Sequence, residues 1–200
     1  MKKRTLIIIL ILAGLLLVFG IFYFITQIQE NKISKLESKI DLLKEETIPL
    51  RFKILKKENG YINFALKLYD SDDNEIIRKE FQLKGTQLSF DFVVLPVNDK
   101  YLAFPYKIFT DEIAPENGEL LYDLYDKNGF PQIYNTANID KDVYASLTSI
   151  FELLKTNNTD ELDGIFGSMV QDVKKYNEFT EYQIYKVVIH TKGGIEIIED

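Results

Sequence analysis

The stretch that decides the fold class is Tyr-Ile-Asn-Phe-Ala-Leu-Lys-Leu-Tyr at residues 61–69. Large apolar side chains occupy every second position from Ile62 to Leu68, and the positions between them hold Asn63, Ala65 and Lys67. Successive side chains of a β-strand point to opposite faces, whereas a helix needs apolar residues three or four positions apart. The alternation therefore predicts a strand with one face in an apolar core.

Short runs of similar character lie on both sides of this stretch, separated by turn sequences rich in Asn, Asp and Gly. Three of these turns, Glu58-Asn59-Gly60, Glu116-Asn117-Gly118 and Asp126-Lys127-Asn128-Gly129, contain Asn-Gly, a strong signal for a tight hairpin. Strands at such near-regular spacing predict an antiparallel β-sandwich or barrel. The predicted strands are residues 52–56, 62–68, 75–83, 87–97, 101–110, 119–125 and 130–134.

Residues 136–200 are predicted to form two helices and a C-terminal β-hairpin. One apolar helical face runs from Ile139 to Leu154 and a second from Leu162 to Tyr176. Strands at 182–191 and 195–198 flank a Lys-Gly-Gly turn. The sequence leaves open whether this ααββ part packs on the β-rich part (51–135) or extends its sheet. With no Pro-, Gly- or Ser-rich linker between them, we expect one composite α+β domain at 51–200.

Residues 5–25 are an uncharged, strongly apolar run near the start of the chain. At about 1.5 Å of rise per residue, a helix of this length spans the roughly 30 Å hydrocarbon core of a bilayer. No small-residue cleavage pattern follows, and no cysteine is present to carry a lipid. We expect a single uncleaved transmembrane helix, a signal-anchor. A buried core helix is the alternative, but this run lacks the polar face of an amphipathic helix.

The orientation follows from Lys2, Lys3 and Arg4, which lie immediately before the apolar run. Cytoplasmic flanks of membrane helices are enriched in Lys and Arg, so residues 1–4 are predicted to be a cytoplasmic tail. The bulk of the chain then lies outside the cytoplasm, and a bacterial inner membrane facing the periplasm fits this arrangement best. Three lysines after the run, at residues 32, 35 and 39, oppose this bias.

Residues 26–48 are predicted to be a helical stalk with a short coiled coil. Ile33, Leu36, Ile40 and Leu43 recur at spacings of three and four, as at positions a and d of two heptads. β-branched residues at a with leucine at d favour a parallel pair, so these residues are the predicted oligomerisation surface. The partner is a second copy or another membrane-anchored protein, and the alternative is an unpaired stalk or a helix packed on its own domain.

Composition excludes several function classes. The chain carries 31 acidic and 24 basic residues, which is the opposite of the charge expected for a nucleic-acid-binding protein. The absence of cysteine excludes disulfides, thiol nucleophiles and thiolate metal sites. The single histidine, His190, excludes a site with several histidine ligands. We expect no cofactor.

One segment has part of a calcium-loop pattern. Asp70, Asp72 and Asn74 match positions 1, 3 and 5 of such a loop. Position 6 is Glu75 instead of the required glycine, and position 12 is Phe81 instead of the bidentate glutamate. The segment is therefore predicted to be a solvated hairpin turn.

The remaining candidates for chemistry are few. His190 is the only candidate imidazole base, but no nucleophile-elbow sequence accompanies it, so a structural role is expected. Asp91, Asp111 and Glu112 lie at predicted strand ends, where an acid/base pair could be assembled, although turn and surface carboxylates are the simpler interpretation. Aromatic residues at 104–106, 122, 125, 130 and 134 could form a patch for peptide or glycan, or could be ordinary strand residues.

These observations predict a non-catalytic, single-pass membrane-anchored envelope protein that binds or scaffolds other proteins outside the membrane. A tethered module that binds or senses a small ligand or glycan is the second hypothesis, and a carboxylate-dependent hydrolase is the third. An apolar pocket with convergent polar groups would favour the second, and two close carboxylates in a cleft the third.

Overall fold

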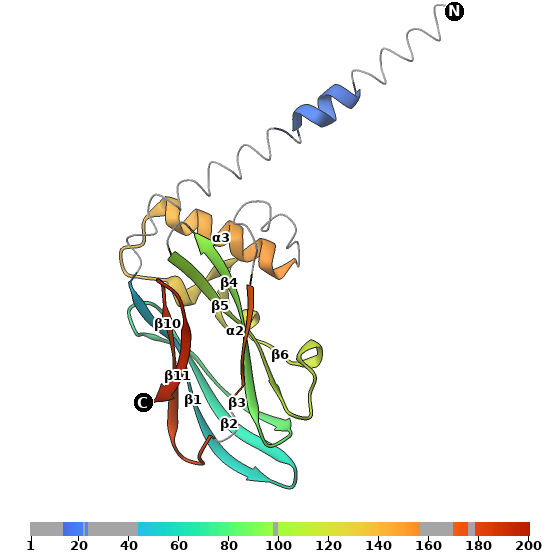
Figure 1. Ribbon diagram of the computed structural model, residues 1–200. Helices are drawn as coiled ribbons and strands as arrows, with labels where there is room; N and C mark the ends of the chain where they lie inside the picture. The colour runs from blue at the N-terminus through green and yellow to red at the C-terminus, as the bar shows by residue number, and fades with distance from the viewer. Residues whose placement is uncertain (1–13, 22, 24–43, 98–99, 157–169, 176–178) are drawn as a thin grey trace, which may run out of the picture.

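The computed structural model describes residues 14–21, 23, 44–97, 100–156, 170–175 and 179–200. The domain is a sandwich of two antiparallel sheets (Figure 1). The first sheet has the strand order β11-β10-β1-β2-β3 and the second has the order β6-β5-β4-β9. Strands of the first sheet are β1 (Glu46–Glu58), β2 (Tyr61–Tyr69), β3 (Glu75–Lys84), β10 (Ile184–His190) and β11 (Ile195–Glu199). Strands of the second are β4 (Leu88–Val97), β5 (Lys100–Thr110), β6 (Glu119–Leu120) and β9 (Val170–Lys175).

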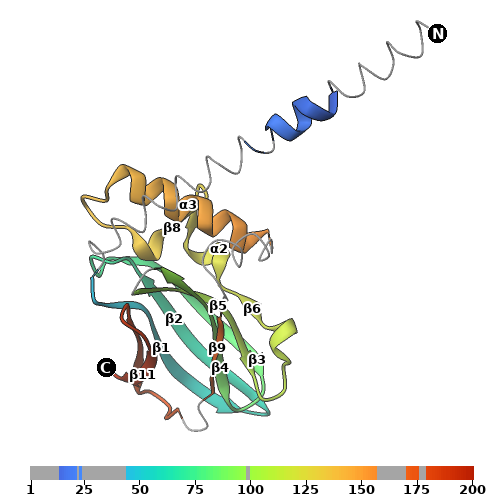
Figure 2. The same ribbon diagram turned by 45° about the horizontal axis from the view of Figure 1, so that its top comes forward.

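Short elements and one longer helix close one end of the sandwich (Figure 2). They are α2 (Tyr122–Tyr125), the ladder of β7 (Asp126–Lys127) with β8 (Phe130–Pro131), η3 (Gln132–Tyr134) and α3 (Lys141–Lys155). The short η2 (Pro115–Asn117) lies apart from them, beside β6 (Figure 2). Helix α3 begins after Asp140, whose carboxylate accepts hydrogen bonds from the backbone N–H groups of Asp142 and Val143. Such an N-cap satisfies backbone donors that the first helical turn leaves unpaired.

The core lies between the two sheets. The four apolar residues of the quoted stretch, Ile62, Phe64, Leu66 and Leu68, are all 0% exposed, which confirms the predicted inward face of β2. Phe52 of β1 bridges the sheets, with its ring centroid 4.9 Å from that of Phe90 on β4. Full burial of a phenylalanine side chain stabilises a fold by about 1.5–3 kcal/mol, so these residues are the main source of stability.

Two of the three Asn-Gly turns form as predicted, whereas Asn117 ends η2 and Gly118 has a φ of −66°. Asn59 and Gly60 have φ values of +53° and +75°, and Asn128 and Gly129 have +55° and +82°. Two consecutive residues with positive φ give the turn whose twist matches paired antiparallel strands, and asparagine and glycine adopt that conformation most readily. These turns connect β1 to β2 and β7 to β8.

Two tyrosine hydroxyls bind the helical end to the free edge of β5. The Tyr134 hydroxyl donates to the carbonyl oxygen of Ala103 and accepts from the Ala103 N–H, both at 2.8 Å. The Tyr125 hydroxyl donates to the carbonyl oxygen of Pro105, also at 2.8 Å. Beyond the short strand β6, these hydroxyls take the place that the peptide groups of a neighbouring strand would have.

The C-terminal hairpin is confirmed, and it extends the first sheet, since β10 pairs with β1. The predicted first helix is confirmed as α3. The first strand is longer than predicted, because β1 begins at Glu46, inside the residues assigned to the stalk. Pro49 fits within β1 because the ladder with β10 is irregular between Thr47 and Leu50, and proline is tolerated at such irregularities.

The second predicted helix is wrong for residues 170–175, which form β9 on the edge of β4. The apolar spacing of these residues fits a helical face. In the fold, however, they pair with β4, whose backbone N–H and C=O groups need a neighbouring strand, and this pairing prevails over the local pattern. The strand predicted at 119–125 is also mostly wrong. Only Glu119–Leu120 pair with β5, and α2 follows because burial of Tyr122 and Tyr125, three residues apart, requires a helical turn. The strand predicted at 130–134 ends at Pro131 and continues as η3.

Within the described ranges, no helix is both long enough and apolar enough to cross a membrane. Of the predicted membrane segment 5–25, only residues 14–21 and 23 are described, and these are helical. The predicted oligomerisation residues Ile33, Leu36, Ile40 and Leu43 lie outside the described residues.

Candidate interaction surface on the five-stranded sheet

The outer face of the first sheet, the side turned away from the second sheet, carries the candidate site. Because side chains alternate along a strand, the inward residues Leu50, Phe52 and Ile54 of β1 leave Arg51 and Lys53 on the outer face. The same alternation on β2 places Lys67 and Tyr69 outside. The alternation that builds the core thus also presents cations to solvent.

The strand register aligns four cationic side chains, one from each of four neighbouring strands, into one row across the outer face. We call it the cation row. Arg51 of β1 lies directly opposite Lys186 of β10 on one side and opposite Lys67 of β2 on the other. Lys67 in turn lies opposite Arg78 of β3. Directly opposite residues have Cβ atoms about 4.5–5.5 Å apart, and like charges so placed destabilise a sheet. The cation row is therefore a local electrostatic cost in a chain whose net charge is −7.

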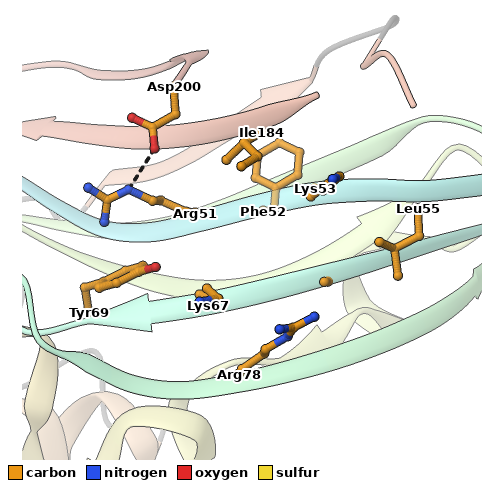
Figure 3. A pocket seen from close by; sticks show the side chains of 10 residues that line it. Arg51, Phe52, Lys53, Leu55, Lys67, Tyr69, Arg78, Ile184 and Asp200 are labelled. Atoms are coloured by element: carbon orange, nitrogen blue, oxygen red, sulfur yellow. Dashed lines mark hydrogen bonds and ion pairs between the residues drawn. The ribbon is translucent and has the colours of Figure 1, made fainter. Parts of the chain in front are cut away.

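Acidic side chains offset part of this cost at the β10 and β1 end of the row. Arg51 Nε lies 3.1 Å from the Asp200 carboxylate (Figure 3). Lys186 Nζ lies 2.9 Å from the same carboxylate, which therefore bridges the two cations. A hydrogen bond from Lys186 is the main reason that the pKa of Asp200 lies below its usual value. Arg51 also contacts Asp73 at 3.0 Å, and its guanidinium carbon lies 4.4 Å from the centroid of the Tyr69 ring.

The other end of the row is more open. Lys67 Nζ lies 2.5 Å from Glu75, and this hydrogen bond is the main cause that raises the pKa of Lys67. Arg78 lies 3.5 Å from Glu80. Side-chain exposure rises along the row, from 18% for Arg51 to 55% for Arg78. Exposed pairs of this kind are worth about 0–1 kcal/mol each, so they do not hold the cations strongly.

A shallow depression of about 440 Å³ lies over this part of the sheet (Figure 3). Four of its lining residues are cationic and only Asp200 is acidic. Apolar side chains of Leu55, Ala65 and Ile184 also line it, and Ile184 is 44% exposed. The depression thus combines a positive charge with exposed apolar surface. The complete lining is Arg51, Phe52, Lys53, Leu55, Ala65, Lys67, Tyr69, Arg78, Ile184 and Asp200.

A strained residue lies beside the depression. Tyr182 has a φ of +67°, a conformation that bulky side chains rarely adopt, and its side chain is 66% exposed. Its backbone N–H donates to the Ile54 carbonyl oxygen at 2.8 Å, and the ammonium of Lys53 lies 5.9 Å from its ring centroid. Backbone strain of this kind is found most often at functional sites, where the surrounding structure enforces it.

The Asp70 turn uses its carboxylates for internal hydrogen bonds. Asp70 Oδ1 accepts from the backbone N–H groups of Asp72 and Asn74, at 2.9 and 2.8 Å. Asp72 Oδ2 accepts from Ala137 N at 2.6 Å, and Asp73, with a φ of +66°, contacts Arg51. The oxygens are thus arranged around backbone donors, as in an ordinary Asx turn. Across the described residues there is also no group of three His, Asp or Glu side chains that could hold a metal ion.

His190 has a structural position at the end of β10. Its Nε2 lies 2.9 Å from Glu196 and its Nδ1 3.2 Å from Glu46. The hydrogen bond with Glu196 is the main cause that raises the pKa of His190, and the charge of Glu46 adds to it. Glu46 is among the residues predicted to form the stalk but begins β1, so His190 ties the start of β1 to the β10–β11 hairpin.

The three carboxylates proposed from sequence do not form one site. Asp91 is fully buried within β4, opposite Lys107. Asp111, beyond the end of β5, is held by the backbone N–H groups of Thr86 and Gln87 at 2.7 and 2.9 Å. Burial raises the pKa of Asp111, but these hydrogen bonds together lower it by more than burial raises it, so the pKa of Asp111 lies below the usual value. Glu112 lies 2.9 Å from Lys84.

The predicted aromatic patch is mostly interior. Tyr122, Tyr125, Phe130 and Tyr134 are each no more than 4% exposed, and the rings of the first three pack against α3. Tyr106 is half-buried, with its ring centroid 5.1 Å from that of Tyr122, and the partly exposed Tyr144 of α3 is stacked on Phe130 with 4.2 Å between the ring centroids. These tyrosines therefore position the helical end and do not present a surface.

Comparison of the chain with protein-family models, curated proteins and solved structures found no match. The outer face of the first sheet is therefore the feature from which the function is inferred.

Proposed function

We propose that this protein is a non-catalytic, single-pass membrane-anchored envelope protein that binds another protein outside the membrane. The observation that carries the proposal is the depression on the outer face, where a cation row and exposed apolar side chains are combined. Interfaces need both apolar surface to bury and polar groups that fix specificity. An open depression on a sheet suits a protein partner better than a small molecule, since ligand pockets enclose most of their ligand.

The membrane anchor is supported by the uncharged run at residues 5–25. The described residues 14–21 support it further, because they are helical and their large apolar side chains are 54–76% exposed. Figures 1 and 2 show these residues beyond the α3 end, away from both sheets. In water such exposure would be unfavourable, whereas in lipid it is the expected surroundings.

Topology is tested by protease treatment of intact cells or spheroplasts. We expect the domain at 51–200 to be digested from the extracytoplasmic side while the chain keeps its N-terminus. Protection of the domain, or a mature chain beginning after residue 25, would contradict the anchor and its orientation.

Association through Ile33, Leu36, Ile40 and Leu43 belongs to the same proposal, because a shared membrane raises the effective concentration of short helices. Cysteines at Leu36 or Leu43 are expected to crosslink in the full-length protein, to a second copy or to one partner. Equal crosslinking at Ser34 and Ser38, which lie between the a and d positions, would mean that the segment is only a stalk.

The interaction surface is tested with a photoreactive residue in the full-length protein in native membranes. It is placed at Ile184, in the depression, or at Leu120 of β6, which lies in the other sheet. Leu120 is a matched control because the two side chains are 44% and 42% exposed. We expect a defined protein adduct from Ile184 and none from Leu120. Adducts of equal yield from both positions, or none from Ile184, would refute the binding of a partner protein at this face in native membranes.

A further inference from the structure

We propose that the depression on the outer face binds an extended segment of the partner in which acidic and apolar residues alternate. The inference rests on the proposed function and names the chemistry of the partner. Its basis is the juxtaposition of two rows on one sheet face, a row of four cations and a neighbouring row with apolar side chains.

The cation row recognises the acidic residues. Strands lie about 4.8 Å apart, so the row from Lys186 to Arg78 crosses four strands and spans roughly 14 Å. An extended peptide rises about 3.3 Å per residue, so five residues cover this distance. Residues i, i+2 and i+4 of the peptide point to the same side, and acidic residues at these positions would face the cation row.

The neighbouring row explains the apolar residues. Two residues farther along the strands, Ile184 of β10 and Ala65 of β2 lie on either side of Lys53. Leu55 lies beyond them on β1 and also lines the depression. A peptide that runs across the strands between the two rows points its side chains at i, i+2 and i+4 to the cations. Its side chains at i+1 and i+3 then point to this apolar surface. The apolar surface is what favours a polypeptide over a uniformly charged polymer.

Asp200 marks where a carboxylate fits. It bridges Arg51 and Lys186 at 3.1 and 2.9 Å, the distances of charge-assisted hydrogen bonds. Asp200 follows β11 at the rim of the depression, and its own backbone N–H donates to the carbonyl oxygen of Ile184. A carboxylate of the partner would take the same place, so Asp200 competes with the partner from within the chain.

The test uses the full-length protein in detergent and two fluorescent peptides of identical composition. In one, four Glu and three Leu alternate; in the other, the same residues stand in two blocks. We expect the alternating peptide to bind several-fold more tightly, and salt to weaken its binding because the cations are partly exposed. Fluorescence anisotropy gives both affinities. Equal affinity for the two peptides, or no binding of either, would overturn the proposal.

Three variants locate the binding. Arg51→Gln is expected to weaken binding about tenfold, since it removes a partly buried charge that the ligand carboxylate contacts. Asp200→Asn is expected to strengthen binding, which a misfolded variant could not do. Lys79→Gln is the control, because Lys79 is an exposed cation beside Arg78 whose ammonium lies over the ring of Phe81, 4.6 Å from its centroid. An equal effect of Lys79→Gln would indicate unspecific charge attraction and overturn the proposal.

Other occupants give different outcomes. Binding to vesicles of anionic lipid, lost in Arg51→Gln without any preference between the peptides, would assign the depression to a lipid surface and overturn the proposal. Self-association that Arg51→Gln abolishes would assign it to a second copy, with the same consequence. If Ile184 crosslinks a protein but neither peptide binds, the interaction surface stands and the acidic segment is refuted. If Ile184 gives no adduct and the alternating peptide binds as predicted, the proposed partner protein is refuted, whereas the preference of the depression for an alternating acidic and apolar segment is upheld.

Discussion

The substitution of Tyr134 by phenylalanine gives a sharp test of how the helical end is held to β5. Tyr134→Phe keeps the ring, with its packing on Phe104 and under α3, and removes only the hydroxyl. That hydroxyl is the hydrogen-bond partner of both the N–H and the C=O of Ala103, and Ala103 is 1% exposed. Water cannot replace the lost partner without opening the structure.

A buried polar group left without a hydrogen bond costs about 1–3 kcal/mol, so two such groups predict a loss of about 2–6 kcal/mol in the free energy of unfolding. Tyr125→Phe is the matched comparison, because Tyr125 is also buried and satisfies only the carbonyl of Pro105. It predicts about half that loss, about 1–3 kcal/mol.

Urea unfolding of the full chain, followed by far-ultraviolet circular dichroism, measures both losses. We expect the midpoint to fall and the slope with denaturant to stay constant, since the unfolded surface is the same. A loss below about 1 kcal/mol for Tyr134→Phe, or one no larger than that for Tyr125→Phe, would refute the reasoning that the double hydrogen bond closes the β5 edge.

Three further predictions concern charged groups. The pKa of His190 is raised by Glu196 and Glu46, so its stabilising effect is complete below its unfolded pKa of about 6.5 and is lost as pH rises through the higher folded value. His190→Gln should therefore lower the urea midpoint at pH 6 and much less at pH 9. An equal effect at both pH values would contradict this. Millimolar calcium should leave the melting temperature unchanged, because Asp70 already accepts backbone hydrogen bonds; a rise of several degrees would show that the turn binds the ion. The pKa of Asp111 is lowered by hydrogen bonds from Gln87 and Thr86, so its contribution to stability is present above pH about 4 and is lost as pH falls through the folded pKa. The urea midpoint of Asp111→Asn should therefore approach that of the unchanged chain at acid pH. A constant difference between the two midpoints down to pH 2 would argue against this role of Asp111.

The inward and outward faces of β1 and β2 could be predicted from sequence because burial itself produces the alternation. Ile62 to Leu68 became the core face, and the positions between them became the outer face. The same physics could have placed Arg51, Lys53 and Lys67 together on one side of their strands. The register that brings Lys186 opposite Arg51 could not be predicted, because β10 and β1 are more than 130 residues apart in sequence.

The errors have a common origin in tertiary pairing. Residues 170–175 carry a spacing that fits a helical face, and only the open edge of β4 makes them a strand. Tyr122 and Tyr125 looked like strand aromatics, and only their joint burial against Phe151 makes them a helical turn. A local pattern reports which residues are buried, but a partner distant in sequence decides which geometry buries them.

The start of the domain links the proposed surface to the segment that precedes it. Three consecutive residues each contact a different charged side chain: Lys44 lies 3.6 Å from Asp72, Glu45 2.6 Å from Lys192 and Glu46 3.2 Å from His190. Exposed ion pairs are individually weak, but the carbonyl oxygen of Glu45 also accepts from the N–H of Thr191 at 2.9 Å.

Because Glu46 begins β1 and β1 carries Arg51, a tilt imposed on this junction is transmitted along one continuous strand to the cation row. The outer face therefore has a fixed orientation relative to residue 44. The direction from which a partner can reach the depression is then set, relative to residue 44, by the fold itself.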